Sequence, residues 1–231
     1  RNITIYPNPP SNLSFAVDSV VCNGEFSGRL RMQNVDSPVG QYYYSLRHVA
    51  SNRTSNASGG ETQSLSNLNA GQYRLTVENY YLDGGNMRRT CAVCTTFTVG
   101  EPSLLTFSSQ IPNQPGTTHP ISCAGGSDGV IEVQASGGNR GYSYTLGNAG
   151  GTPLQGPTAL QYDAPVRFEA LNASTIYSLY IRDAKGCSRA QYGIRLTEPE
   201  PLGAAAFAKN TYASYSIACH DGRDTAGVQV L

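Results

Sequence analysis

Apolar and polar residues alternate along much of this chain with a period of two. The alternation is clearest at residues 29–33, 73–77, 130–134 and 177–181, where apolar side chains alternate with polar ones. This pattern predicts strands that bury one face and expose the other. Turn-forming clusters of Gly, Asn and Asp separate these segments, and no stretch has the spacing of an amphipathic helix. The chain is therefore expected to be all-β.

The pattern is written twice with a period of about one hundred residues, and it starts again at Cys219. The matching positions are Cys22, Gly28, Leu30 and Met32 with Cys123, Gly129, Ile131 and Val133; residues 42–46 with 142–146; residues 68–70 with 171–173; and Tyr73, Leu75 and Val77 with Tyr177, Leu179 and Ile181. A period of this size is that of a small domain. With about six to eight short strands per period, we expect tandem immunoglobulin-like antiparallel β-sandwich domains in an extended array.

Proline-containing junctions mark the expected domain boundaries. Proline fixes its own φ and removes a backbone donor, so Pro7–Pro10, Glu101-Pro102 and Glu198–Pro201 predict short, stiff connectors. The expected division is residues 1–10 as the last strand of a preceding repeat, 11–102 as repeat 1, 103–199 as repeat 2, and 200–231 as the opening strands of a third, truncated repeat. We therefore expect the chain to be a window from a longer protein.

The first copy carries an insertion of seven residues. Leu68 and Cys91 are 23 positions apart, whereas Leu171 and Cys187 are 16 apart. The extra residues fall within 80–87, around an Asp-Gly-Gly turn sequence. A hairpin tip tolerates such additions, so a longer hairpin is predicted there.

Each copy has one Cys near its start and another near its end. This placement predicts disulfides within each copy, Cys22 with Cys91 and Cys123 with Cys187. Each bond would close a loop of about 65 to 70 residues and contribute roughly 4 kcal/mol in the chain-entropy model. Disulfides also imply an oxidising compartment.

Two cysteines are left over. Cys219 would await a partner beyond the end of the chain. Cys94 has three alternatives: it replaces Cys91 as the partner of Cys22, stays buried and free, or bonds another chain. Zinc binding at Cys91-x-x-Cys94 is disfavoured because neither a second such pair nor nearby His is present.

The charge pattern excludes some partners. Sixteen basic and sixteen acidic residues give a net charge of zero, and like charges do not cluster. A nucleic-acid partner is therefore not expected. No apolar stretch is long enough to cross a bilayer, so no membrane span is expected in this segment.

No motif indicates catalysis. His48, His119 and His220 occupy non-equivalent places and lack a nucleophile elbow or any comparable frame. Acidic turn residues such as Asp128 and Asp183 are scattered. We expect no catalytic, cofactor-binding or metal site; a structural calcium at the Asp128 turn remains the alternative, although a dense run of Asp and Asn is missing there.

Tyrosine is abundant, with 15 residues, and no Trp is present. On alternating strands some Tyr side chains point inward as core, and outward ones could stack on sugar rings.

The sequence also contains candidate sites of covalent modification. Five Asn-x-Ser/Thr sequons, which are N-glycosylation acceptors only in an exported eukaryotic protein, occur at Asn2, Asn12, Asn52, Asn56 and Asn172.

The second copy has a characteristic set of spaced residues: Cys123, Gly129, Gly137-Gly138, Tyr142, Tyr144, Leu171, Tyr177, Asp183, Gly186-Cys187 and Glu198-Pro199. In these positions it resembles the SprB repeat of large surface adhesins of gliding and other Bacteroidota. The first copy departs from it, with Ser27 in the place of Asp128, Ser37-Pro38 in the place of the Gly pair, and Cys94 without a counterpart. The resemblance implies type IX secretion, and it makes Ser19 and Thr225 candidates for O-glycosylation within Asp-Ser/Thr-apolar triplets.

These observations favour a non-enzymatic, extracellular repeat protein, the stalk or fibre segment of a bacterial surface adhesin. Its expected partners are neighbouring repeats, other copies in a filament built by strand donation, and surface glycans. The alternative is a carbohydrate-binding accessory region of a secreted polysaccharide-active protein.

Overall fold

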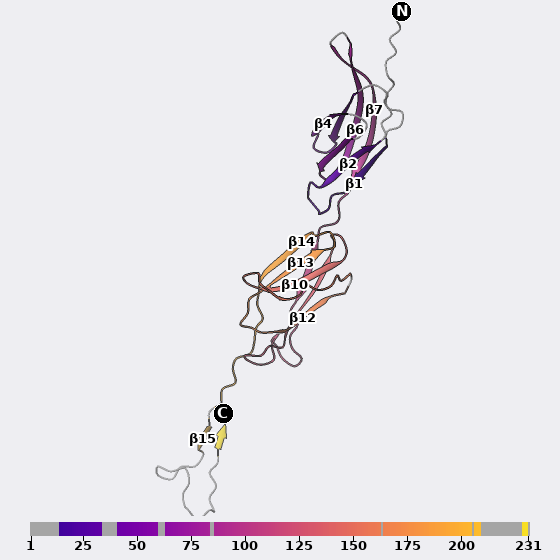
Figure 1. The fold of residues 1–231 in the computed structure, drawn as a ribbon. Coiled ribbons are helices and arrows are strands. Elements are labelled where there is room, and N and C mark those ends of the chain that lie inside the picture. Colours follow the sequence, from indigo (N-terminus) through magenta and orange to yellow (C-terminus); the bar gives the residue numbers. More distant parts are fainter. Residues whose placement is uncertain are drawn as a thin grey trace, which may run out of the picture. The chain divides into compact units, whose positions relative to one another are not determined.

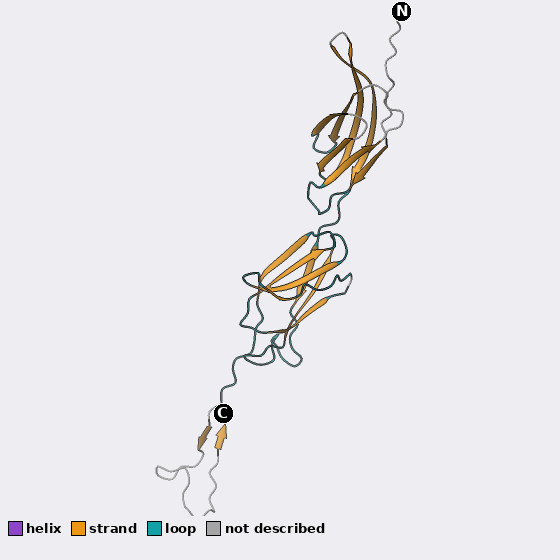
Figure 2. Ribbon diagram, in the orientation of Figure 1, coloured by secondary structure: helices purple, strands orange, loops and turns teal. Residues whose placement is uncertain are grey.

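The computed structural model describes residues 14–33, 41–59, 63–83, 86–162, 164–204, 206–208 and 228–230 (Figure 1). Within these ranges every regular element is a strand and no helix occurs (Figure 2). The predicted all-β class is confirmed.

The contacts divide the chain into two compact units. One unit is Arg1–Ser109 with Val133–Val166 and Tyr177–Gly193, and the other is Gln110–Glu132 with Arg167–Ile176 and Ile194–Leu231. The domain boundaries expected from the sequence stay a prediction.

The first seven strands form two antiparallel sheets. They are β1 (Ser14–Asp18), β2 (Gly28–Gln33), β3 (Gln41–His48), β4 (Thr54–Gly59), β5 (Gln63–Leu68), β6 (Gly71–Asp83) and β7 (Asn86–Val99). The strand orders are β1-β2-β5 and β4-β3-β6-β7. One buried hydrophobic cluster contains Leu30 of β2, Leu46 of β3 and Leu75 of β6, so the two sheets face each other as a sandwich.

The next seven strands repeat this order. They are β8 (Thr106–Gln110), β9 (Gly129–Ser136), β10 (Tyr142–Asn148), β11 (Pro153–Gln155), β12 (Val166–Leu171), β13 (Tyr177–Asp183) and β14 (Ser188–Ile194). Their sheets are β12-β9-β8 and β11-β10-β13-β14, which match β5-β2-β1 and β4-β3-β6-β7. The predicted tandem immunoglobulin-like fold is confirmed. Two short strands, β15 (Ala206–Ala208) and β16 (Val228–Val230), pair with each other.

Both copies use the same strand register. The corresponding cross-strand pairs are Tyr44–Val77 and Leu46–Leu75 in the first copy, and Tyr144–Ile181 and Leu146–Leu179 in the second. All eight side chains are at most 1% exposed. A slip of one residue would turn each of them toward solvent, so burial specifies the shared register.

The predicted insertion lengthens the hairpin of β6 and β7. The two strands pair from Gly71–Val99 to Asp83–Asn86, whereas β3 accompanies β6 only as far as Tyr80. Strand β6 has 13 residues and its counterpart β13 has 7. Figure 1 shows the extra length projecting past the rest of the sheet. The hairpin prediction is confirmed.

Some predicted features lie outside the described residues. These are residues 1–10, Asn12, Ser37-Pro38, Gly84-Gly85, Cys219, His220 and Thr225, together with the side chain of Cys91.

Candidate functional site

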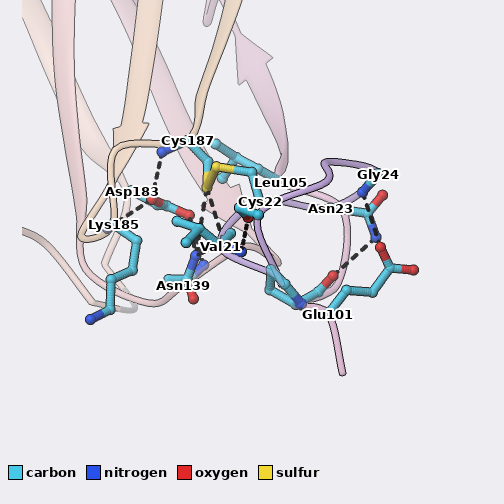
Figure 3. Close-up of a disulfide and its surroundings, with 12 residues drawn as sticks. Val21, Cys22, Asn23, Gly24, Glu101, Leu105, Asn139, Asp183, Lys185 and Cys187 are labelled. Atoms are coloured by element: carbon cyan, nitrogen blue, oxygen red, sulfur yellow. Dashed lines mark hydrogen bonds between the residues drawn. A yellow bond between two sulfur atoms is a disulfide. The ribbon is translucent and has the colours of Figure 1, made fainter. Parts of the chain in front are cut away.

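A disulfide joins two cysteines that the sequence places in different copies. Cys22, in the loop between β1 and β2, is bonded to Cys187, in the turn between β13 and β14 (Figure 3). Their Cα atoms are 5.6 Å apart and they are separated by 165 residues. Both lie in the first compact unit. The bond therefore links the opening loop of the first copy of the sequence pattern to the closing turn of the second copy.

The predicted bond between Cys22 and Cys91 is wrong, because Cys22 is bonded to Cys187 and Cys91 lies far along β7 from the Cys22 loop. The N–H of Val20 donates to the carbonyl of Gly100 at 2.9 Å, which places the Cys22 loop at the end of β7. Cys91 precedes Val99 by eight residues of that strand. At about 3.4 Å per residue this is roughly 27 Å, whereas bonded cysteines have Cα atoms within about 7 Å.

The Cys22 loop is held by the Glu-Pro pair that ends its own copy. The N–H of Gly24 donates to a carboxylate oxygen of Glu101 at 3.0 Å, and the Asn23 amide donates to the carbonyl of Pro102 at 3.0 Å. Gly24 has a φ of 78°, which favours glycine. The Glu-Pro pair is therefore more than a connector: it fixes the loop that presents Cys22.

Asp183 organises the turn that presents Cys187. One carboxylate oxygen accepts from the N–H groups of Lys185 and Cys187, both at 2.9 Å. The other accepts from the backbone N–H of Asn139 at 2.8 Å and from its side-chain amide at 3.1 Å. Burial raises the pKa of Asp183, but these hydrogen bonds, those from Asn139 first, outweigh it and hold the pKa below its usual value.

Further contacts surround the sulfur bridge. The side-chain amide of Asn139 donates to the carbonyl of Val21 at 2.9 Å. The sulfur of Cys187 lies 3.4 Å from the same oxygen, which is a packing contact because a bonded sulfur carries no hydrogen. A cleft of about 320 Å³ lies beside the bridge, and Arg189 donates from Nε to the carbonyl of Leu105 in its wall at 3.2 Å.

Two cysteines in the described part of the chain are free and exposed, Cys94 and Cys123. The predicted bond between Cys123 and Cys187 is wrong, since Cys22 occupies the sulfur of Cys187. Cys94 is free, which corresponds to one of its three alternatives, but it is exposed rather than buried. Hydrogen bonds from Thr76 and then Arg74 lower the pKa of the Cys94 thiol.

The two histidines within the described residues, His48 and His119, have local structural contacts. His48 is 7% exposed and packs on Tyr73 with ring centroids 4.9 Å apart. Its Nδ1 lies 2.7 Å from the hydroxyl of Ser51. His119 contributes backbone groups to a turn with Gln114. His48 is thus a core residue of the first sandwich.

The predicted turn and modification residues have local partners. Asp128 accepts from the N–H of Ser122 at 3.1 Å, and hydrogen bonds with Ser122 lower its pKa. No group of three or more His, Cys, Asp or Glu suited to a metal occurs among the residues described. Of the candidate glycosylation residues, Ser19, Asn52 and Asn56 are exposed, and Asn172 caps a turn by accepting from Thr175 at 3.0 Å.

The tyrosines divide between core and surface. Tyr42 and Tyr44 are buried, and burial together with Tyr42 raises the pKa of Tyr44 to about 12. On the outer face of β13 and β14, Tyr180 and Tyr192 form an edge-to-face pair with ring centroids 5.8 Å apart. Tyr192 is 67% exposed. In the first copy Thr76 stands where Tyr180 does, so this aromatic pair is specific to the second copy.

A hollow of about 760 Å³ lies over this aromatic pair. Its walls include Arg182 and Arg189 as the charged residues. The remaining lining residues, which are polar or small apolar side chains, are Ser143, Thr145, Pro157, Ile181, Ser188 and Ala190. The hollow therefore combines an aromatic surface, hydroxyl groups and positive charge.

Comparison with known proteins finds a family match within the second copy. Residues 116–151, which contain the Cys123 loop and the paired glycines, match the family model described as the SprB repeat. The predicted family resemblance is confirmed. A two fibronectin type-III domain segment from chicken tenascin is 14% identical, with a match that covers 80% of this chain and 99% of that chain at a TM-score of 0.33. No curated protein matches the chain. The described residues contain no helix that is long and apolar enough to span a membrane.

Sequence reasoning missed the residues that position Cys22 and Cys187. Asp183 was noted as a scattered turn acid and as one position of the family resemblance, and Glu101 only as part of a junction. The available signal was that both copies have a Gly two residues after the opening Cys and a Glu-Pro pair at the end. Asn139 carried no such signal, because its partner Val21 is 118 residues away.

Proposed function

We propose that this chain is a non-enzymatic, load-bearing segment of an extracellular bacterial surface adhesin. The observation that carries the proposal is the disulfide from Cys22 to Cys187, which ties one copy of the pattern to the next. A covalent tie prevents the chain between the two cysteines from being drawn out under tension. Such bonds persist in oxidising compartments, which agrees with export to the cell surface. The SprB-repeat match is consistent with this role.

Force spectroscopy on the whole chain tests the proposal. If the termini are pulled, force passes through the disulfide and the 165 residues between the cysteines are shielded. After reduction, unfolding should release roughly 55 to 60 nm of additional contour length, at 3.3 to 3.6 Å per residue. The Cys22→Ser/Cys187→Ser variant should show this release without reductant, and Cys94→Ser should behave as the unmodified chain. Equal contour lengths with and without reductant would contradict the proposal.

A second candidate function rests on the hollow over Tyr180 and Tyr192. Exposed aromatic rings stack on sugar faces, and Arg182 and Arg189 suit a carboxylate-bearing sugar. Titration with an acidic polysaccharide such as a polyuronate should show saturable binding that Tyr192→Ala abolishes. Tyr162→Ala is the matched control, because Tyr162 is 59% exposed and is not part of the hollow. Equal binding by the two variants would eliminate this site.

Filament formation through strand donation by residues 1–10 is a further proposal. Those residues lie outside the described part of the chain. Sedimentation of the chain at high concentration would test it, since a donor strand predicts oligomers and its removal predicts a monomer.

A further inference from the structure

We propose that Cys123 is the site of the next link in the same series, bonding a turn cysteine of a repeat that follows the second copy. The inference rests on the proposed load-bearing function and adds the identity of the linking residue and of its partner. It starts from a comparison of the two loops that carry Cys22 and Cys123.

The Cys123 loop is built like the Cys22 loop. Glu101 accepts from Gly24 at 3.0 Å, and Glu198 accepts from Gly125 at 2.8 Å. The φ angles of the two glycines are 78° and 74°. The backbone of the two cysteine-bearing loops is therefore held in the same conformation by equivalent hydrogen bonds.

The backbone on either side of each cysteine is fixed equivalently as well. The N–H of Val21 donates to the hydroxyl of Ser27 at 2.8 Å, and the N–H of Ser122 donates to the carboxylate of Asp128 at 3.1 Å. The carbonyl of Cys22 accepts from Glu25 at 3.1 Å, and the carbonyl of Cys123 accepts from Gly126 at 2.9 Å. The exchange of Ser27 for Asp128 therefore preserves the loop.

The disulfide formed by Cys22 indicates what kind of partner Cys123 bonds. Cys22 is bonded to the β13–β14 turn of the following copy, whereas Cys123 is exposed and free. The bonded state of Cys22 is an observation independent of loop geometry, and it shows the chemistry that this loop type performs. The partner of Cys123 is thus the thiol of a cysteine in a turn like that of Cys187.

The structure also specifies what surrounds that thiol. Around Cys187, an Asp accepts from the N–H of the cysteine and an Asn donates its amide to the carbonyl before the opposing cysteine. Ser122 occupies the place of Val21, so its carbonyl is the expected acceptor. The partner is therefore a repeat that contains an Asp-x-x-Gly-Cys turn and an Asn equivalent to Asn139.

Bond formation is an oxidation. Two thiols form one sulfur–sulfur bond and release two protons and two electrons, which a disulfide-containing oxidant accepts by thiol–disulfide exchange. Oxidised glutathione serves as that oxidant in the experiment, and it is reduced to two thiols.

The test uses a chain that supplies the missing partner. Residues 1–199 are followed by another copy of residues 103–199, refolded with oxidised and reduced glutathione, and mapped by mass spectrometry of non-reduced peptides. The expected map contains Cys22–Cys187 and Cys123 bonded to the appended copy of Cys187. In the unextended 231-residue chain, Cys123 should be alkylated by iodoacetamide in the folded state.

Two variants complete the design. Cys123→Ser should free the appended turn cysteine for alkylation and leave Cys22–Cys187 intact, and Cys94→Ser should leave both bonds in place. A map that keeps Cys22–Cys187 but leaves Cys123 free, or that pairs Cys123 with Cys219 in the unextended chain, overturns this inference alone. A map without either bond between copies overturns the proposed function as well.

Discussion

At the scale of single residues, a few hydrogen-bonding side chains fix the loops that carry cysteine. Asp183 accepts four hydrogen bonds, and Glu101 and Glu198 each accept one from a loop glycine. Asp183 is buried, and a buried charged acceptor is costly to lose because the donors facing it are left without a partner, whereas Glu101 and Glu198 are exposed. These residues therefore determine where the thiols lie.

Replacing Asp183 with Asn should destabilise the protein by about 1 to 3 kcal/mol at pH 7, because an amide NH₂ faces backbone donors. The pKa of Asp183 is depressed in the folded state, so its stabilisation is present above the unfolded-state pKa of about 3.9 and is lost as the pH falls further. Urea unfolding should show the gap between the variant and the unmodified protein narrowing below about pH 4.

Asp18→Asn is the matched control for this experiment. Asp18 forms an exposed ion pair with Arg31 at 2.6 Å, and such pairs contribute less than about 1 kcal/mol. A loss for Asp183→Asn no larger than that for Asp18→Asn would contradict the role assigned to Asp183.

At the scale of strands, the alternation in the sequence was sufficient to locate the core and the register. Tyr44, Leu46 and their counterparts Tyr144 and Leu146 were visible as aligned apolar positions, because period-two burial leaves a direct trace in sequence. The partner of Cys22 was not visible. The spacing of cysteines in the sequence does not show which end of β7 lies beside the Cys22 loop. The loop lies beside the end at Val99, and Cys91, the partner predicted for Cys22, is eight residues away along the strand.

Gly28 and Gly129 lie at the start of equivalent strands, β2 and β9, where another backbone approaches closely. A Cβ at Gly28 would lie 2.7 Å from the carbonyl oxygen of Leu68 and 2.7 Å from Val99. A Cβ at Gly129 would lie 2.8 Å from the carbonyl oxygen of Leu171 and would overlap Leu196.

Gly28→Ala and Gly129→Ala should each cost about 1 to 3 kcal/mol, since backbone atoms cannot move away freely. Thermal unfolding of both variants would measure this. Gly203→Ala serves as the control because nothing lies within 4 Å of its Cβ position. Unchanged melting temperatures in the two strand variants would show that the close approach is not maintained in solution.

The extension of the β6–β7 hairpin should be dispensable for folding. Past Tyr80 the hairpin has no partner in β3. Replacing residues 81–88 with Asn-Gly, which suits a two-residue turn, should change the free energy of unfolding by less than about 1 kcal/mol. Urea denaturation of the shortened chain checks this, and a loss well above that value would assign the extension a structural role.

At the scale of the whole molecule, the sequence repeat and the disulfide together define one way in which successive copies are linked. Each copy presents one cysteine on the loop that its own Glu-Pro pair holds, and the turn of the following copy receives it. The scheme reconciles the recurrence of cysteines near the start and end of each copy with their unexpected pairing. It also explains why a cysteine such as Cys123 is free in a chain that supplies no later turn cysteine within its described residues.

Reduction should therefore destabilise the folded chain measurably. A bond that closes a loop of 165 residues contributes up to about 5 kcal/mol in the chain-entropy model. Urea midpoints at pH 7 should fall on addition of a phosphine reductant, while the Cys22→Ser/Cys187→Ser variant should begin at the lower midpoint and not respond. Far-UV circular dichroism should stay the same, because the described core of the first sandwich contains no cysteine. If the midpoint of the unmodified chain does not respond to reductant, the bond does not constrain the unfolded chain, and the free cysteine at residue 123 would lose its role as a site for a further link.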